Sequence, residues 1–453
     1  MQVVVVETPE LGDRSYLVHD GTVGFVVDPQ RDIDRVQAEI DRAGVKVTHV
    51  LETHIHNDYL TGGLGLAAEL GAEYVVSARD DVEFNRVPAS EGSEFEIGQM
   101  RVRALHTPGH TPNHLSYLVL ENGSPQAVLT GGSLLYGTVG RTDLISEEMT
   151  EELTRLQFRS ARRLMTEIPG AARVLPTHGF GSFCASSSTS PDGPGDMATE
   201  QLQNQASVIA DEDDFVASVI PGLGPYPTYY RYMAPLNRRG PSPIHDHDDA
   251  TLPELDAQEL GRRLAQGGWV LDTRDRRDFA RRHLAGTVGM ELSPTHFSTY
   301  VGWLAPFDEP VTLLTEGRDA FLRARRDLMR IGMDRLEVNT RGFAANSDSL
   351  PTSSYEVTDF ESLAAAGSFS RPVLDVRQRA EWCTGHLRGS QNIPIQDLPQ
   401  RMDELPKGEL LVHCASGYRA SVAASLIDRA GHPVVLIDDD FANAQRVGLP
   451  MES

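Results

Sequence analysis

The 453-residue sequence has few cysteines, a deficit of basic residues and no long apolar run. Its three cysteines, Cys184, Cys383 and Cys414, are too few and too irregularly spaced for a disulfide framework, which favours a reducing cytoplasm. Lysine and arginine number 41 against 65 aspartates and glutamates, and the resulting net charge of -24 argues against a nucleic-acid partner. No apolar run approaches the roughly 18 residues that cross a bilayer, and the N-terminus lacks the features of a signal peptide. We therefore expect a cytoplasmic protein with no membrane partner.

What the sequence does contain is a cysteine at a strand-to-helix junction near its C-terminus. Cys414 follows the apolar run 410–412 and precedes a helix-like run at 420–430. At such a junction the sulfur faces free backbone N–H groups and the positive end of a helix dipole, which favours the nucleophilic thiolate. Arg419 closes the loop and can bind an anion through two parallel hydrogen bonds. The predicted catalytic residues are Cys414, Gly417 and Arg419, with Ser416 and Tyr418 binding substrate.

The length of this loop indicates the class of substrate. Four residues separate Cys414 from Arg419, whereas cysteine phosphatases place five there and so form a wider cradle. The shorter loop resembles that of rhodaneses. The resemblance implies that Cys414 carries sulfane sulfur as a persulfide, with thiosulfate, persulfides and small-molecule thiols as partners.

An internal repeat precedes the loop. Aligning residues 271–288 with 374–391 gives seven identities in eighteen columns without a gap, so we expect two copies of one domain. The strand that should deliver the cysteine in the first copy, 311–314, is followed by Thr315 and Glu316 instead. Threonine cannot carry a persulfide, and glutamate would repel an anionic donor, which predicts a catalytically silent first copy.

Histidines recur at predicted strand ends in the N-terminal part of the chain. His54, His56 and Asp58 follow one strand, and His110 and His178 come in two later loops. Alternate residues of an extended segment point the same way, so His54 and His56 can hold one ion. The predicted metal ligands are His54, His56, Asp58, His110 and His178.

This pattern resembles the metallo-β-lactamase fold, whose signature is His-x-His-x-Asp-His followed by a His, an Asp and a final His. Within that superfamily, Gly140-Arg141-Thr142-Asp143 is similar to a motif of persulfide dioxygenases, which oxidise glutathione persulfide at one Fe(II). Fusions of such enzymes to rhodanese domains match the layout of this chain. The resemblance implies that Arg141 holds a substrate carboxylate; an ion pair with Asp143 is the alternative.

Two positions depart from the family pattern. Tyr59 replaces the last histidine of the first motif, and Gly132 replaces the metal-binding aspartate. The facial-triad iron site needs two histidines and one carboxylate, so the site is one ligand short. Three outcomes stay open: Fe(II) held through His54 and His110 with water or His56, which we favour; Zn(II) held by three histidines; or a metal-free site that binds thiols.

Three further features are assigned to packing or linker. Cys184 comes a few residues after His178 and could approach the site, but packing within a loop is favoured for it. Cys383 is expected to be a small packed residue. The acidic and histidine-rich stretch 245–249 is interpreted as linker.

The sequence thus predicts an α/β multidomain protein. It comprises a metallo-β-lactamase αββα sandwich with a helical extension (1–240), a linker (241–254), an inactive rhodanese-like domain (255–346) and an active rhodanese domain (355–453). The predicted function is sulfane-sulfur metabolism, in which a rhodanese sulfurtransferase is coupled to a persulfide dioxygenase-like unit acting on a glutathione-type persulfide. The alternatives are a zinc-dependent thioester hydrolase similar to glyoxalase II, and a degenerate thiol-binding module beside rhodanese activity alone. The direction of sulfur transfer and the formation of a homo-oligomer stay open.

Overall fold

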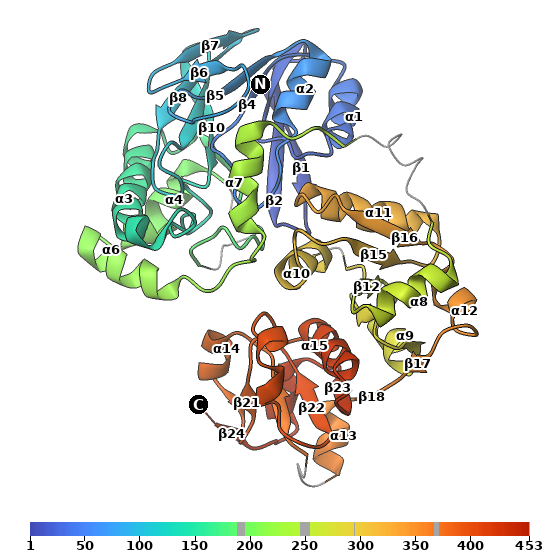
Figure 1. The fold of residues 1–453 in the computed structure, drawn as a ribbon. Helices are drawn as coiled ribbons and strands as arrows, with labels where there is room; N and C mark the ends of the chain where they lie inside the picture. Colours follow the sequence, from blue (N-terminus) through green and yellow to red (C-terminus); the bar gives the residue numbers. More distant parts are fainter. Residues whose placement is uncertain (188–194, 245–253, 294, 367–370, 453) are drawn as a thin grey trace. The chain divides into compact units, whose positions relative to one another are not determined.

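The computed structural model describes residues 1–187, 195–244, 254–293, 295–366 and 371–452. The chain divides into two compact units (Figure 1). The first contains residues 1–249 with the segments 294–299 and 326–332, and the second contains the remainder. One boundary, at 249/250, lies in the predicted linker, whose histidine-rich part, 245–249, is outside the described residues. The segments 294–299 and 326–332 of the predicted inactive rhodanese-like domain cluster with the first unit. No helix in the described part of the chain is both long and apolar enough to cross a membrane.

The first unit contains two β-sheets. In one sheet, antiparallel pairing joins the first three strands and parallel pairing joins the third to the sixth. Its strands, in spatial order, are β1 (Gln2–Thr8), β2 (Asp13–His19), β3 (Val23–Val27), β4 (Lys46–Leu51), β5 (Glu73–Ser77) and β6 (Val87–Ala89). The other sheet has the order β11 (Arg173–Pro176), β10 (Ser124–Gly131), β9 (Leu115–Glu121), β8 (Met100–His106) and β7 (Glu94–Ile97).

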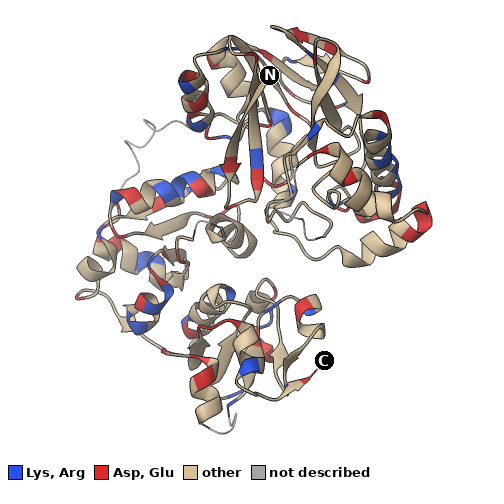
Figure 2. Cartoon of the chain, turned by 180° about the vertical axis from the view of Figure 1, so that it is seen from behind, with Lys and Arg blue, Asp and Glu red and all other residues tan. Residues whose placement is uncertain are grey.

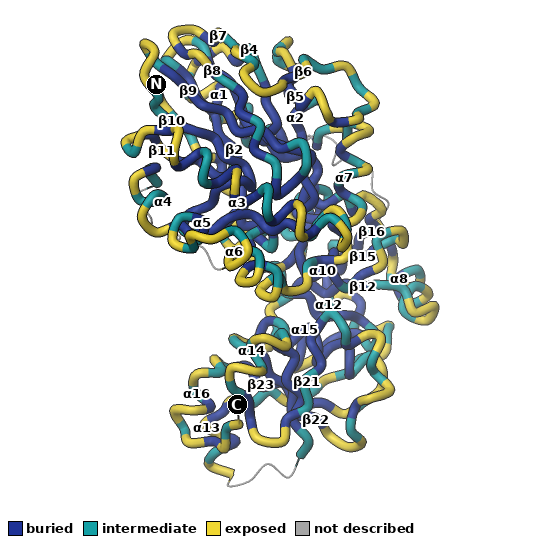
Figure 3. Tube along the Cα trace, turned by 90° about the vertical axis from the view of Figure 1, so that its left-hand side faces the viewer, coloured by how far each residue is buried: buried dark blue, intermediate teal, exposed yellow. Residues whose placement is uncertain are grey.

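Apolar side chains from both sheets form one central core. Phe25 of β3 and Tyr117 of β9 belong to the same buried cluster, as do Val27 and Leu129. Alternate residues of a strand point to opposite faces, so each sheet also offers an outer apolar face. Figure 3 shows the strands as the most buried part of this unit.

Helices cover the two outer faces and complete an αββα sandwich. Val36 and Ile40 of α1 (Asp34–Ala43) and Leu66 of α2 (Gly63–Leu70) pack on the first sheet. Leu164 of α3 (Thr150–Glu167) packs on the second sheet. This arrangement is the predicted fold.

The predicted helical extension is divided into several short helices. It consists of α4 (Met197–Gln203), α5 (Gln205–Val208), α6 (Glu212–Val219) and, farther along, α7 (Tyr230–Arg239). Asn204 accepts a hydrogen bond from the N–H of Ala206, and Asp211 accepts from those of Asp213 and Asp214. Each side chain caps a new helix start, which ends the preceding helix.

The second unit contains two parallel sheets. The first has the order β14 (Val288–Gly289), β12 (Trp269–Asp272), β15 (Val311–Leu314) and β16 (Leu336–Asn339). The second has the order β21 (Gln391–Asn392), β19 (Val373–Asp375), β22 (Leu410–His413), β23 (Val434–Ile437) and β18 (Glu356–Thr358). Two short ladders pair β13 (His283–Leu284) with β17 (Thr352–Ser353), and β20 (His386–Leu387) with β24 (Met451–Glu452).

The strand order of the first sheet recurs in the second. The repeat-bearing strands β12 and β19 each lie between a short strand and the strand that leads into the loop at 315 or 414. This correspondence supports the proposal that 255–346 is a second copy of the fold at 355–453.

The C-terminal half of the chain also contains helices. They are α8 (Ala257–Ala265), α9 (Arg276–Arg281), α10 (Phe297–Leu304), α11 (Arg318–Arg330), α12 (Gly342–Asn346), α13 (Phe360–Ala365), α14 (Arg379–Cys383), α15 (Tyr418–Arg429) and α16 (Phe441–Arg446). Figure 2 shows acidic and basic residues interspersed along helices such as α3 and α11. Interspersed charge of this kind is typical of a solvated surface and not of a nucleic-acid interface.

Candidate functional site

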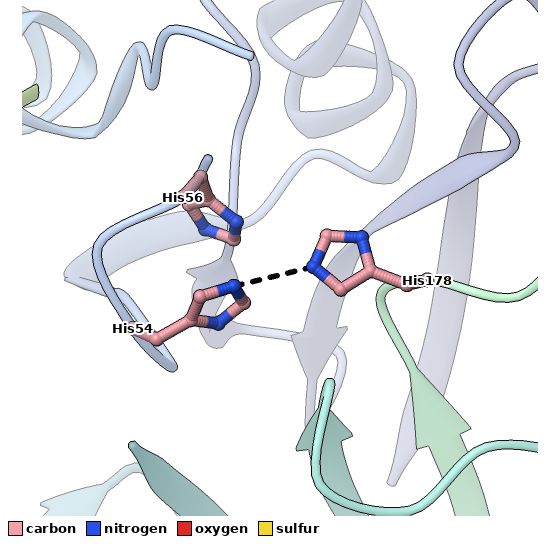
Figure 4. Close-up of side chains that lie close together, drawn as sticks. All are labelled: His54, His56 and His178. Carbon is pink, nitrogen blue, oxygen red and sulfur yellow. Dashed lines mark hydrogen bonds between the residues drawn. The ribbon is translucent and has the colours of Figure 1, made fainter. Parts of the chain in front are cut away.

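All five predicted metal ligands are brought together at the ends of strands in the first unit. His54, His56 and Asp58 follow β4, His110 follows β8 and His178 follows β11. Each has at most 1% of its surface exposed. Figure 4 shows His54 and His56 on one loop and His178 on another, with the rings of His54 and His178 facing each other.

Hydrogen bonds made by Nδ1 fix the orientation of the rings of His54 and His178. Nδ1 of His54 lies 2.8 Å from the hydroxyl of Thr53, whose proton goes to Asp28, so this nitrogen donates. Nδ1 of His178 donates to Asp13 at 2.9 Å. Both Nε2 lone pairs therefore point inward, where the two atoms lie 3.2 Å apart. Two facing lone pairs repel, so a cation between them, a proton or a metal ion, is required.

His56 and His110 show the same arrangement. Nε2 of His56 faces Glu52 at 3.2 Å and Asp28 at 3.3 Å, which leaves its buried Nδ1 without a hydrogen-bond partner. Nδ1 of His110 donates to the carbonyl of Arg141 at 2.8 Å, which leaves its buried Nε2 without a partner. A metal-binding histidine usually makes a hydrogen bond from its other ring nitrogen to a carboxylate or a backbone carbonyl. Described residues thus provide a histidine-rich set that can hold a metal ion.

The supporting carboxylates were not identified from the sequence. Asp13 begins β2, Asp28 follows β3 and Glu52 follows β4, far apart in the chain but buried together beside the histidines. Asp28 also accepts from the backbone N–H of Thr53 and from the hydroxyl of Thr177. Only the fold reveals that these carboxylates lie behind the imidazoles.

Burial and nearby carboxylates divide the histidines into two groups, one with a lowered pKa and one with a raised pKa. Burial lowers the pKa of His54 well below its usual value, and it lowers that of His110 to about 3. Burial also opposes protonation of His56 and His178, but Asp28 raises the pKa of His56 to about 9, and Asp58 and Asp13 raise that of His178 well above its usual value. A metal ion entering the cluster would therefore displace protons.

His114, which the sequence analysis also missed, lies beside His54 with ring centroids 5.0 Å apart. Its Nδ1 bonds to Thr107, and its Nε2 accepts the N–H of Gly132 at 3.0 Å. Both nitrogens are occupied, so His114 positions the backbone at Gly132 and is not part of the converging set.

Gly132 stands where the family pattern has an aspartate, and His110 fills the adjacent space. A Cβ at this position would lie 2.2 Å from Cδ2 of His110. We expect Gly132→Asp to displace His110 and lower zinc and iron binding at least tenfold, measured as metal content after dialysis. Gly132→Ala, with the same Cβ and no carboxylate, should also weaken binding. Tighter binding by Gly132→Asp would contradict this geometry.

Arg141 forms an ion pair with Asp143, which is the alternative to binding a substrate carboxylate. It donates to Asp143 through two nitrogens at 2.7 and 2.8 Å, and to the carbonyls of Phe183 and Gly224. Only 3% of its side chain is exposed. The guanidinium thus connects the loop at 183 and the extension at 224 to the site.

Two cysteines differ from expectation. Cys184 does not merely pack in a loop, because its sulfur lies beside His110 and His178 and is fully buried. Cys383 is exposed at the end of α14 and not packed. The Ser- and Gly-containing stretch around Cys184 carries no strand pattern, so the sequence left its approach to the site as the less favoured alternative.

The loop at Cys414 has the predicted strand–loop–helix form. Cys414 follows β22, is 1% exposed, and its sulfur accepts the N–H of Gly417 at 3.2 Å. Gly417 has φ of 92°, which favours glycine, and a Cβ there would lie 2.1 Å from Asp438. Helix α15 begins at the next residue, so its N-terminus faces the sulfur.

The other predicted residues of this loop differ in their surroundings. Arg419 forms a two-pronged pair with Glu381, at 2.6 and 2.8 Å, and its side chain is 15% exposed. Ser416 is exposed. The hydroxyl of Tyr418 donates to the carbonyl of Glu291 at 3.0 Å. Arg419 and Ser416 are therefore the polar side chains of the loop nearest to solvent.

The corresponding loop of the proposed first copy has a similar backbone. Gly317 has φ of 92°, as Gly417 does. Thr315 occupies the position of the cysteine and is buried, and Glu316 accepts the N–H of Phe343 at 3.0 Å. A glycine with positive φ is present in both loops, two residues after Thr315 and three after Cys414, while the nucleophile is absent from the first copy.

Comparison with known proteins identifies both folds. Residues 10–178 match the model of the metallo-beta-lactamase superfamily, and residues 356–446 match that of the rhodanese-like domain. The proposed first rhodanese copy, 255–346, lies outside these matches. A metallo-beta-lactamase structure from Staphylococcus aureus subsp. aureus COL superposes with a TM-score of 0.65 at 23% identity, over 75% of this chain and 99% of that one.

Curated relatives align with parts of the chain. A hydroxyacylglutathione hydrolase of Acidiphilium cryptum is 34% identical over 25% of this chain and 48% of its own length. Another, from Methylococcus capsulatus, is 30% identical over 39% of this chain and 66% of its own length. The chain thus spans about half of the first relative and two thirds of the second. Taken together, the fold, the histidine cluster and the family matches show that this protein combines a metallo-β-lactamase superfamily domain with a C-terminal rhodanese-like domain.

Proposed function

We propose that the protein is a sulfane-sulfur enzyme in which Cys414 carries sulfur as a persulfide. The supporting observation is the Cys414 sulfur, which accepts the N–H of Gly417 at the start of α15. A thiolate in this position attacks the outer sulfur of thiosulfate, the S–S bond breaks, and sulfite leaves with the electron pair. A small-molecule thiolate then takes the sulfur and regenerates Cys414.

Arg419 is proposed to bind the anionic donor. Its pair with Glu381 holds the guanidinium in place beside the loop, and a guanidinium offers enough donors for a second anion. Charge-assisted hydrogen bonds contribute about 1.5–3 kcal/mol. We expect Arg419→Gln to raise the KM for thiosulfate about 10–100-fold in a sulfur-transfer assay.

Arg419→Lys is the matched control for that experiment. It keeps the charge but loses the planar fork, so its KM should lie between those of the parent and Arg419→Gln. Equal KM values in all three proteins would show that Arg419 does not bind the donor.

For the metallo-β-lactamase domain we propose a single metal ion held by His54, His56, His110 and His178, acting on a persulfide of a glutathione-type thiol. Support comes from the four inward-facing nitrogens and from the persulfide dioxygenase-like motif at 140–143. A bound Fe(II) would supply oxygen activation, and a bound Zn(II) would supply Lewis acidity. The chain's own carboxylates, Asp13, Asp28 and Glu52, keep the imidazoles oriented.

The experiment is oxygen uptake by Fe(II)-loaded Cys414→Ser protein given glutathione persulfide, because that variant removes rhodanese chemistry. Uptake with sulfite formation is the expected result. No uptake by protein that retains stoichiometric iron would contradict the dioxygenase assignment, and thioester hydrolysis by the zinc form would then identify a hydrolase.

A further inference from the structure

Cys184 is held at a fixed place in the wall of the histidine cluster. Its carbonyl accepts the N–H of Arg141 at 2.8 Å, and its own N–H donates to the hydroxyl of Ser182 at 3.1 Å. Two residues on, the N–H of Ser186 donates to the carbonyl of Val139 at 3.0 Å. These bonds attach Cys184 and Ser186 to residues 139–141, so the backbone position of Cys184 is defined.

The buried sulfur lies close to potential metal-binding atoms. Cys184, His110 and His178 each offer a ligand atom, and these atoms lie within 4.8 Å of one another. Nε2 of His110 is buried and has no hydrogen-bond partner. The thiol itself reaches the hydroxyl of Tyr230 at 3.9 Å. The unpartnered imidazole nitrogen and the sulfur thus share one buried space.

We propose that Cys184 is a thiolate ligand of the metal ion and binds it beside His110 and His178. This inference rests on the metal site proposed above. On binding, the thiol loses its proton to solvent and a sulfur lone pair forms the bond to the ion. Zinc and iron both accept mixed imidazole and thiolate ligands.

Charge explains why a thiolate suits this site. The family pattern supplies an anionic ligand at 132, and Gly132 supplies none. Imidazoles are neutral ligands, so with histidine ligands alone the charge of a divalent ion would be balanced only by the surrounding buried carboxylates, such as Asp13 and Asp28. A thiolate at Cys184 would supply a negative charge directly to the ion.

Cobalt(II) absorption tests this proposal without measuring activity. The Cys383→Ser/Cys414→Ser protein keeps Cys184 as its one cysteine, and the probe is Co(II) alone. A sulfur-to-cobalt charge-transfer band in the near ultraviolet is expected together with the visible bands of tetrahedral cobalt. Adding Cys184→Ser should remove the ultraviolet band while the visible bands persist.

Two other outcomes of the cobalt experiment would contradict different parts of the proposal. Visible bands without the ultraviolet band in the Cys184-containing protein would overturn the thiolate ligand but keep the histidine site. No cobalt bands at all would overturn the metal site and the thiolate ligand together.

Zinc competition gives a second readout. Cys184→Ser and Cys184→Ala should each weaken zinc binding at least about 10–100-fold, the range found for outer-shell partners of metal ligands. Alanine fits within the space of cysteine, so circular dichroism of that variant controls for folding. Parent-like zinc affinity in the folded alanine variant would overturn the proposal.

Discussion

Cys414→Ser is expected to reduce thiosulfate:thiol sulfur transfer by about 10³-fold or more, to the background of the uncatalysed reaction. The loop would keep its shape, since serine is no larger than cysteine and the N–H of Gly417 can donate to its hydroxyl. A hydroxyl cannot hold sulfane sulfur, however, so the chemical step is lost and not merely slowed. The measurement is sulfite or thiocyanate formation from thiosulfate with a thiol or cyanide acceptor.

Cys383→Ser is the matched control for the loss of a cysteine. Cys383 is exposed on α14 and outside the loop, so its replacement should leave the rate within about twofold of the parent, as is usual for surface substitutions. Full activity of Cys414→Ser would show that sulfur transfer does not proceed through this residue.

His110→Ala and His178→Ala are expected to lose the bound metal. Each removes a nitrogen aimed into the cluster, so the ion loses one of its proposed ligands. Affinity should fall by more than about 100-fold, beyond the 10–100-fold typical of outer-shell changes. Competition with a chromophoric chelator measures the affinity, and elemental analysis measures the content.

A histidine of the first unit that lies outside the cluster provides the comparison. His49 of β4 lies 3.3 Å from Glu73 and not among the converging nitrogens. His49→Gln should bind metal as the parent does. Unchanged metal content in His110→Ala and His178→Ala would mean that the ion, where present, is held elsewhere.

Much of this architecture could be predicted from local sequence patterns. The strand at 311–314 was placed at its observed bounds, and Cys414 and the histidines lie at strand ends as expected. These predictions succeed because a strand end and a following loop are encoded by neighbouring residues. Family motifs added the order of the two folds.

The remaining features depend on contacts between distant residues. Asp13 and His178 are 165 positions apart, yet the carboxylate of Asp13 orients the imidazole of His178. Cys184 reaches the cluster because its backbone is bonded to residues 139–141, which no periodicity reveals. The break between helices at Asn204 was not predicted, although asparagine is a good helix N-cap. The side-chain amide of Asn204 also donates to the carbonyls of Leu135 and Thr138, so tertiary contacts contribute to the break.

The measurement that tests the central claim most directly is the mass of the Cys414 peptide after the protein has been incubated with thiosulfate and separated from it. The account predicts a gain of one sulfur atom on Cys414, released by a small-molecule thiol. A Cys414 peptide of unchanged mass in protein that still transfers sulfur would contradict it.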